Sequence, residues 1–290
     1  MRQAVVFHRG ALGDSVLTWP LLRSLALRHD EVALVSDLSK ARLAQRLGER
    51  RVLAIDAERP EFAALWRGEA IGAKIDADLV IHLCATPADD AGRAALDLWT
   101  KGAHEMYPGA RIVLSAGVLN RNKAIELAKA HGRLVAVPRR GVPGGPVVMH
   151  IGAGSSEKRW PMPMWRALHQ QFTTLIPGKV IRIIAGEVEE DRLVASERAM
   201  FTAMGGTFLT GLDQLASELE HASGFIGGDS GPTHVAGAMG IPTLALFGPT
   251  NPDDWAPIGP QVHILSPASP RGMAWLRPDE VASQAAALLA

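Results

Sequence analysis

The stretch that decides the fold is GDSGPTHVAGAMGIPTLALFGPTNPDDW at residues 228–255, which follows a short apolar run at Gly224–Gly228. Within it, Asp229-Ser230-Gly231-Pro232 is typical of a turn whose proline occupies the first turn of a helix. Small residues fill that helix, and its free N–H groups and positive dipole end favour an anion. We therefore expect a phosphate-carrying ligand here. The simpler alternative is a capped crossover helix, because aspartate and serine are ordinary N-caps.

Composition places the chain among globular proteins. Its 290 residues are 47% hydrophobic and 21% charged, enough for one large or two medium domains. The net charge of zero argues against a general nucleic-acid binder. The single cysteine, Cys84, allows neither an internal disulfide nor a cysteine cluster for zinc. No run reaches the ~18 apolar residues of a membrane span, so we expect a cytoplasmic protein.

Charge is distributed unequally along the chain. Residues 1–140 carry 21 Lys and Arg against 16 Asp and Glu, whereas residues 141–290 carry 9 against 14. The pairs Arg50-Arg51 and Arg139-Arg140 sharpen the contrast. A basic N-terminal half suits an anionic acceptor or peripheral contact with an anionic membrane surface. Solvated charged faces explain the same pattern equally well.

Strand-length apolar runs alternate with amphipathic helical segments throughout the chain, which indicates an α/β fold. The segment PRRGVPGGP at 138–146 is the best linker candidate, and it divides the chain into domains 1–140 and 141–290. Helices are expected between the strands, near Lys123–Ala130 and from about Pro278. The expected strands are Ala4–Phe7, Val32–Val35, Val52–Ile55, Leu79–Leu83, Ile112–Leu114, Val147–Ile151, Val180–Ala185, Gly224–Ile226, Thr243–Phe247 and Val262–Leu265.

Polar or glycine-rich residues follow most of these strands. Ligands of open parallel sheets bind beyond the carboxyl ends of the strands, where glycines let the backbone approach a ligand. Two such edges facing each other would form an interdomain cleft. The segments concerned are 8–14, 84–86, 152–156, 186–187, 227–230 and 248–251.

Three segments, in order, carry a resemblance to a known family. They are HRGALGDSVLTWPLLRSL at 8–25, GAGSSEKRWPMPMW at 152–165 and the stretch at 228–255. Together they resemble the signature segments of the bacterial heptosyltransferases, glycosyltransferase family nine. The resemblance implies an enzyme of the GT-B type, with two Rossmann-like domains facing each other across a cleft. The N-terminal domain would hold the acceptor and the C-terminal domain the nucleotide sugar.

On the acceptor side, the resemblance makes Asp14 the general base that takes the proton of the acceptor hydroxyl. We also expect Asp14 to be the N-cap of a helix that begins at Ser15, and the two roles can coexist. His8, Arg9 and Gly13 are the expected acceptor-binding residues. The family usually has arginine or lysine where this chain has His8, so Arg9 compensates or the acceptor differs.

On the donor side, Lys158 matches the family lysine that contacts the donor phosphates and offsets charge as the nucleotide leaves. Backbone N–H groups and the helix dipole would hold the diphosphate without a metal. Either Glu187 or Glu189 would bind the ribose hydroxyls. The remaining expected donor-binding residues are Gly154, Ser155, Asp229, Ser230, Gly231 and His234.

The implied reaction is inverting, metal-independent transfer of a sugar to a hydroxyl of the lipopolysaccharide core or a related glycoconjugate. By family default the sugar is heptose from ADP-heptose, and no cofactor is needed beyond this donor. The enzyme would act in the cytoplasm or at the inner face of the inner membrane. A sugar-nucleotide epimerase of the same fold and a non-catalytic nucleotide-binding relative remain the alternatives.

No metal site is expected. Asp76-Ala77-Asp78 resembles a metal-binding Asp-x-Asp motif but precedes a strand, so it is interpreted as a turn. His82 and Cys84 share one side of a strand but lack a third ligand nearby.

Overall fold

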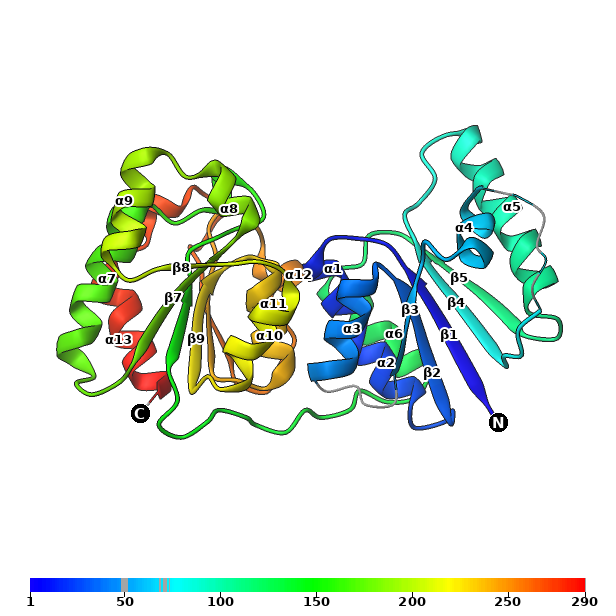
Figure 1. The fold of residues 1–290 in the computed structure, drawn as a ribbon, viewed down its shortest axis with the longest axis horizontal. Helices are drawn as coiled ribbons and strands as arrows, with labels where there is room; N and C mark the ends of the chain where they lie inside the picture. The colour runs from blue at the N-terminus through cyan, green and yellow to red at the C-terminus, as the bar shows by residue number, and fades with distance from the viewer. Residues whose placement is uncertain (48–51, 68, 70–71, 73, 290) are drawn as a thin grey trace. The chain divides into compact units, whose positions relative to one another are not determined.

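The computed structural model describes residues 1–47, 52–67, 69, 72 and 74–289. The chain divides into two compact units, Met1–Val135 and Ala136–Ala290 (Figure 1). The expected linker at 138–146 contains neither helix nor strand. The basic pair at positions 50 and 51 lies outside the described residues.

The N-terminal unit is built on a parallel sheet with the strand order β3-β2-β1-β4-β5. Its strands carry near-continuous apolar runs because helices cover both faces of such a sheet. The strands are β1 Gln3–His8, β2 Glu31–Ser36, β3 Val52–Asp56, β4 Leu79–Cys84 and β5 Arg111–Ala116. The helices are α1 Leu12–Leu17, α2 Trp19–Leu25, α3 Leu38–Leu47, α4 Pro60–Arg67, α5 Asp90–Met106 and α6 Arg121–Ala130.

Helices α4 and α5 pack on each other (Figure 1). Aromatic side chains fill the core beneath them. The ring of Phe7 on β1 makes edge contacts with Phe62 at 5.8 Å and with Trp99 at 5.2 Å between centroids. Helices α2 and α6 also pack together. This buried framework holds the carboxyl ends of β1 and β4 side by side.

The C-terminal unit has a second parallel sheet with the order β11-β10-β9-β6-β7-β8. Its strands are β6 Val147–His150, β7 Ile181–Gly186, β8 Thr207–Leu209, β9 Gly224–Gly228, β10 Thr243–Leu246 and β11 Val262–Leu265. The helices are α7 Met162–Leu175, α8 Glu187–Arg192, α9 Ala195–Ala203, α10 Leu212–Glu220, α11 Gly231–Met239, α12 Pro252–Trp255 and α13 Pro278–Leu289. Two short 3₁₀ helices, η1 Ser156–Lys158 and η2 Met273–Trp275, complete the unit.

Each unit contains a point where the strand order reverses: between β1 and β4 in the first sheet, and between β6 and β9 in the second. Open α/β sheets bind ligands in the crevice outside the carboxyl ends of the strands at such points. The predicted α/β class is confirmed, and every expected strand is present. The short strand β8 was not expected. Among the described residues, no helix combines the length and apolar character needed to cross a membrane.

Helix α11 begins as predicted, with Ser230 as its N-cap and Pro232 at its second position. Residues 233–239 are all buried, so this helix packs closely against β9 and β10. It ends at Gly240, which has the left-handed φ of 82° that a C-terminal glycine commonly adopts. A Cβ atom at Gly240 would lie 2.2 Å from the carbonyl oxygen of Pro138.

We expect Gly240→Ala to lower the free energy of unfolding by more than the ~1–2 kcal/mol that a left-handed conformation costs a non-glycine residue. The clash with the Pro138 carbonyl adds to this cost because backbone must move to relieve it. Urea unfolding of the two proteins measures the difference. Gly178→Ala is the control, since Gly178 also has a positive φ but open space around its Cβ position. Equal losses in both variants would exclude the clash.

Candidate functional site

A cluster of polar side chains lies at the switch point of the C-terminal sheet. Lys158 ends η1, which follows β6, and Asp229 directly follows β9. The ammonium of Lys158 donates to Asp229 Oδ2 at 2.7 Å, although the two residues are 71 positions apart. The hydroxyl of Thr250, beyond β10, donates to the same oxygen at 2.8 Å. Three strand ends therefore converge on one carboxylate.

Asp229 is nearly buried, with 7% of its surface exposed. His234 Nε2, one turn into α11, lies 3.8 Å from the second carboxylate oxygen, Oδ1. Burial by itself raises the pKa of Asp229, but contacts with His234, Lys158 and Thr250 outweigh it, and the pKa lies below its ordinary value. Asp229 is thus a fixed negative charge that holds the Lys158 ammonium at the start of α11.

The Ser230 hydroxyl is turned into the protein. The hydroxyl of Thr233 donates to the carbonyl of Gly228 at 2.6 Å, so its single proton is committed. The contact of 3.1 Å between the hydroxyls of Ser230 and Thr233 therefore has Ser230 as its donor. His150 Nδ1 lies 3.4 Å from the Ser230 oxygen, and burial lowers the pKa of His150 to about 4, which keeps it neutral. These contacts fix the first turn of α11.

The loop that carries Lys158 is anchored by the two residues that follow it. The guanidinium of Arg159 pairs with Glu197 of α9 at 3.0 Å. The indole N–H of Trp160 donates to the carbonyl of Leu276 at 3.1 Å, and the ring of Trp160 makes an edge contact with Trp165 at 4.9 Å. Because Trp160, Trp165 and Leu276 are buried, the backbone beside Lys158 has little freedom.

The other expected donor-side residues lie around the same strand ends. Gly154 has open space where a side chain would lie, and Ser155 is the N-cap of η1. Glu189 is buried and accepts the Gly186 N–H at 3.1 Å, so one of its oxygens caps α8. Glu187, at the start of α8, is exposed.

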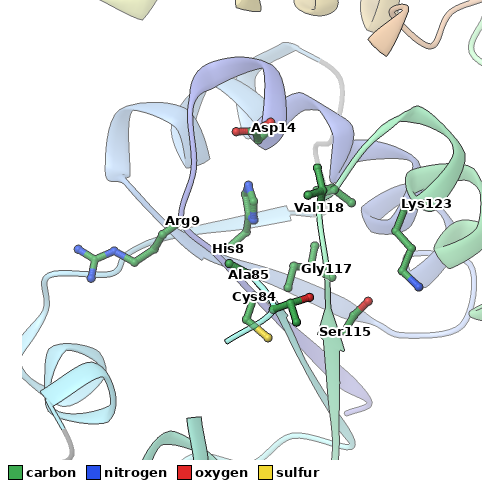
Figure 2. A pocket seen from close by; sticks show the side chains of 12 residues that line it. His8, Arg9, Asp14, Cys84, Ala85, Ser115, Gly117, Val118 and Lys123 are labelled. Carbon is green, nitrogen blue, oxygen red and sulfur yellow. The ribbon is translucent and has the colours of Figure 1, made fainter. Parts of the chain in front are cut away.

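A pocket of about 350 Å³ opens at the carboxyl ends of β1, β4 and β5 in the N-terminal unit (Figure 2). The structure brings three of the expected acceptor-side residues, His8, Arg9 and Asp14, to this pocket. Gly13 precedes Asp14 in α1 but does not line it. The other lining residues are Leu83, Cys84, Ala85, Thr86, Ser115, Gly117, Val118, Leu119 and Lys123.

The expected capping role of Asp14 is wrong. Helix α1 begins at Leu12, not Ser15, and its N-cap is Ala11. Asp14 occupies the third helical position, where its Oδ2 accepts the N–H of Ala11 at 3.2 Å. This is the reach-back half of a capping box, and alanine cannot supply the other half. The hydrogen bond at the helix start uses only Oδ2 of Asp14, and the other carboxylate oxygen, Oδ1, takes no part in it.

His8 is buried in the pocket wall beneath Asp14 (Figure 2). Neither of its ring nitrogens has a hydrogen-bond partner within the described part of the chain. Burial is the main cause that lowers the pKa of His8, and the Asp14 carboxylate offsets part of this effect. Burial and the neighbouring His8 also lower the pKa of His82, to about 4. Both rings are therefore neutral at physiological pH, and His8 is available as a neutral hydrogen-bonding group.

Arg9 points away from Asp14 (Figure 2). Its guanidinium pairs with Glu58 and lies 5.3 Å from the ring centre of Trp66. Lys40, on α3, holds the loop between β1 and α1 by donating to the carbonyl of Gly10 at 2.8 Å. The sequence does not predict that Lys40 holds this loop, that Lys123 lines the pocket, or that Thr250 contacts Asp229. Lysines on helices and a threonine in a loop carry no distinctive pattern.

Within the described ranges, no group of three or more histidine, cysteine, aspartate or glutamate side chains is arranged to hold a metal ion. Asp78, from the Asp-x-Asp segment, uses its carboxylate to accept the N–H of Gln3 at 2.7 Å. That contact joins the start of β1 to the residue before β4.

Comparison with known proteins places this geometry in a family. Residues 122–274, more than half of the chain, match the model of glycosyltransferase family 9 (heptosyltransferase). Lipopolysaccharide heptosyltransferase 1 of Pseudomonas aeruginosa is 34% identical over 131 residues. That alignment covers 43% of this chain and 35% of the relative, so it matches about a third of the relative's length.

Solved structures show the same fold over the whole chain. The family 9 glycosyltransferase of Veillonella parvula has a TM-score of 0.73 at 19% identity and covers 99% of this chain and 97% of its own. The ADP-heptose lipopolysaccharide heptosyltransferase II of Escherichia coli has a TM-score of 0.66 at 17% identity, with coverage of 100% and 98%. The predicted GT-B class with two Rossmann-like domains is confirmed. The chain belongs to glycosyltransferase family 9, the heptosyltransferase family.

Proposed function

We propose that this protein is a glycosyltransferase of lipopolysaccharide biosynthesis that transfers heptose from ADP-heptose to a hydroxyl of the core or of a related glycoconjugate. Its C-terminal unit binds the donor, and its N-terminal unit binds the acceptor. Family membership and the names of its relatives support heptose and ADP. No cofactor or metal takes part in the proposed reaction.

The observation that carries the donor half is the Lys158–Asp229 pair beside the first turn of α11. The backbone N–H groups at a helix start bind phosphate, and a lysine ammonium neutralises further charge. Asp229 uses one N–H of the ammonium, which leaves two donors for the diphosphate. As the bond between the sugar and the diphosphate breaks, charge accumulates on ADP, and Lys158 stabilises it.

The acceptor half rests on Asp14 in the pocket of the N-terminal unit. The acceptor hydroxyl oxygen forms a bond to the anomeric carbon while the bond from that carbon to the phosphate oxygen breaks. Asp14 takes the hydroxyl proton, and ADP leaves with the electron pair of the broken bond. A single displacement of this kind inverts the anomeric configuration. The neutral imidazole of His8, which lies in the pocket wall, forms a hydrogen bond to the acceptor and so orients it.

We expect ADP to stabilise the protein without any divalent metal. The free energy of unfolding increases by RT ln(1 + [L]/Kd), where [L] is the ADP concentration. This increase is roughly 2.7 kcal/mol when ADP exceeds its Kd a hundredfold. Chemical unfolding with and without ADP measures it, in the presence of excess EDTA and again with added magnesium. If EDTA abolishes the gain, a metal rather than the start of α11 and Lys158 holds the diphosphate.

Transfer itself is tested with ADP-heptose and a panel of lipid A precursors and core oligosaccharides, followed by mass spectrometry. The expected result is a mass gain of one heptose on one acceptor class, with release of ADP. Incubation of ADP-sugars without acceptor is the matching control. A change in the sugar under those conditions would indicate an epimerase, and ADP binding without either reaction would indicate a non-catalytic relative.

A further inference from the structure

We propose that Thr250 is a positioning residue that aligns Asp229, and through it Lys158, for the diphosphate. This inference rests on the proposed nucleotide-binding function and extends it to a residue beyond the expected donor site. Thr250 lies 92 positions after Lys158 in the chain, yet both side chains donate to the same oxygen, Oδ2 of Asp229.

The shared oxygen can accept both bonds. A carboxylate oxygen has two lone pairs, and the distances of 2.7 Å from Lys158 and 2.8 Å from Thr250 are normal for charged hydrogen bonds. With one direction occupied by the Thr250 hydroxyl, the ammonium is confined to the other. The carboxylate cannot turn without losing one of the two bonds, so Thr250 restricts where the Lys158 ammonium can lie.

Thr250 is itself held by a well-anchored loop. The carbonyl of Gly248 accepts the N–H of Arg271 at 3.0 Å, and a Cβ at Gly248 would lie 2.5 Å from the sulfur of Met273. On the other side, Asn251 caps α12 by accepting the N–H of Asp253 at 3.1 Å. A loop fixed before and after Thr250 can present its hydroxyl in one place, as a positioning role requires.

The arrangement also keeps Asp229 satisfied while Lys158 binds a diphosphate. When the ammonium also donates to a diphosphate, its bond to Asp229 weakens, and a buried carboxylate oxygen with no second donor would be left poorly satisfied, which is costly. Thr250 remains on Oδ2 and keeps that oxygen satisfied. Loss of the Thr250 hydroxyl should therefore weaken the binding of phosphate-bearing ligands and leave the rest of the nucleotide unaffected.

The test compares Thr250→Val, which keeps the shape and removes the hydroxyl, with Thr250→Ser, which restores it. Binding of ADP and of adenosine is measured by calorimetry or NMR for each full-length variant, alone and combined with Lys158→Ala. Thr173→Val is the matched control, because Thr173 lies on the exposed surface of α7 in the same unit. Circular dichroism and urea unfolding check the fold of every variant.

We expect Thr250→Val to weaken ADP binding about 10-fold or more, the scale of a hydrogen bond to a charged group. Thr250→Ser and Thr173→Val should bind ADP as the wild type does, and adenosine binding should not change. In the Lys158→Ala background, Thr250→Val should add little further loss. The positioning role would be overturned if Thr250→Val kept wild-type ADP affinity or lost adenosine affinity to the same extent as ADP affinity. It would also be overturned if Thr250→Val weakened ADP binding as strongly in the Lys158→Ala background as it does alone. Wild-type protein that binds no ADP would refute the nucleotide-binding proposal itself, a distinct result.

Discussion

Asp14→Asn is expected to lower the rate of sugar transfer about 10²–10⁴-fold, the usual contribution of a general base. Asparagine cannot take the acceptor proton, but its side-chain oxygen can still accept the N–H of Ala11, as Asp14 Oδ2 does. The melting temperature and the affinity for ADP should therefore remain close to those of the wild type. Steady-state transfer rates with a working acceptor, together with thermal unfolding, measure both effects.

Two further variants separate the base from the helix start. Asp14→Ala removes both functions, and loss of the hydrogen bond to the Ala11 N–H should lower the free energy of unfolding by about 1 kcal/mol. Asp37→Asn is the matched control, since Asp37 accepts the N–H of Ser39 at the start of α3 but does not line the pocket. A wild-type transfer rate in well-folded Asp14→Asn protein would show that Asp14 serves only the helix start.

Lys158→Ala is expected to reduce turnover about 10²–10³-fold, the typical cost of removing one group that stabilises charge in the transition state. ADP affinity should fall as well, because the diphosphate loses its cation. The protein should still fold, since Thr250 continues to donate to Asp229 and the Lys158 side chain is partly exposed. Transfer kinetics and ADP titrations of the purified variant check these expectations.

Lys179→Ala is the control for Lys158→Ala, because Lys179 precedes β7 in the same unit and lies outside the cluster around Asp229. It should leave ADP binding unchanged. If Lys158→Ala binds ADP and turns over as the wild type does, Lys158 is not part of the donor site, and the pair with Asp229 serves the fold alone.

The strands were predictable because each carries an apolar run that a sheet covered on both faces requires. The missed strand, β8 at Thr207–Leu209, has three residues, of which only Leu209 is buried. So short a segment has no periodicity to detect. It pairs with β7 through the register Ile184 to Thr207, a contact between distant parts of the chain that no local pattern encodes.

The wrong start of α1 has a local cause. Aspartate is a common N-cap, particularly after a glycine, so the sequence predicts that the helix begins after Asp14. In the structure, Leu12 begins the helix because the Asp14 side chain reaches back to Ala11.

The sequence predicts which residues belong to a donor site, but it does not predict how Lys158, Asp229 and Thr250 are arranged. The resemblance places Lys158 at the donor phosphates and Asp229 in the diphosphate loop, but only the structure shows that the two form an ion pair. The pairing depends on β6 and β9 being neighbours in the sheet, although Lys158 and Asp229 are 71 positions apart in the chain. Thr250 enters the same cluster because β10 lies beside β9.

The dense packing of α11 limits how the proposed nucleotide site can be engineered. Residues 233–239 are all buried, and a Cβ at Gly237 would lie 2.9 Å from a methyl group of Val262 and 3.0 Å from Pro257. Larger side chains in α11 would push the helix away from the sheet and would not change the shape of the ligand site. A side chain at Gly154, by contrast, would meet no atom within 4 Å. Mutant libraries aimed at accepting other nucleotides should therefore diversify position 154 and leave the helix constant.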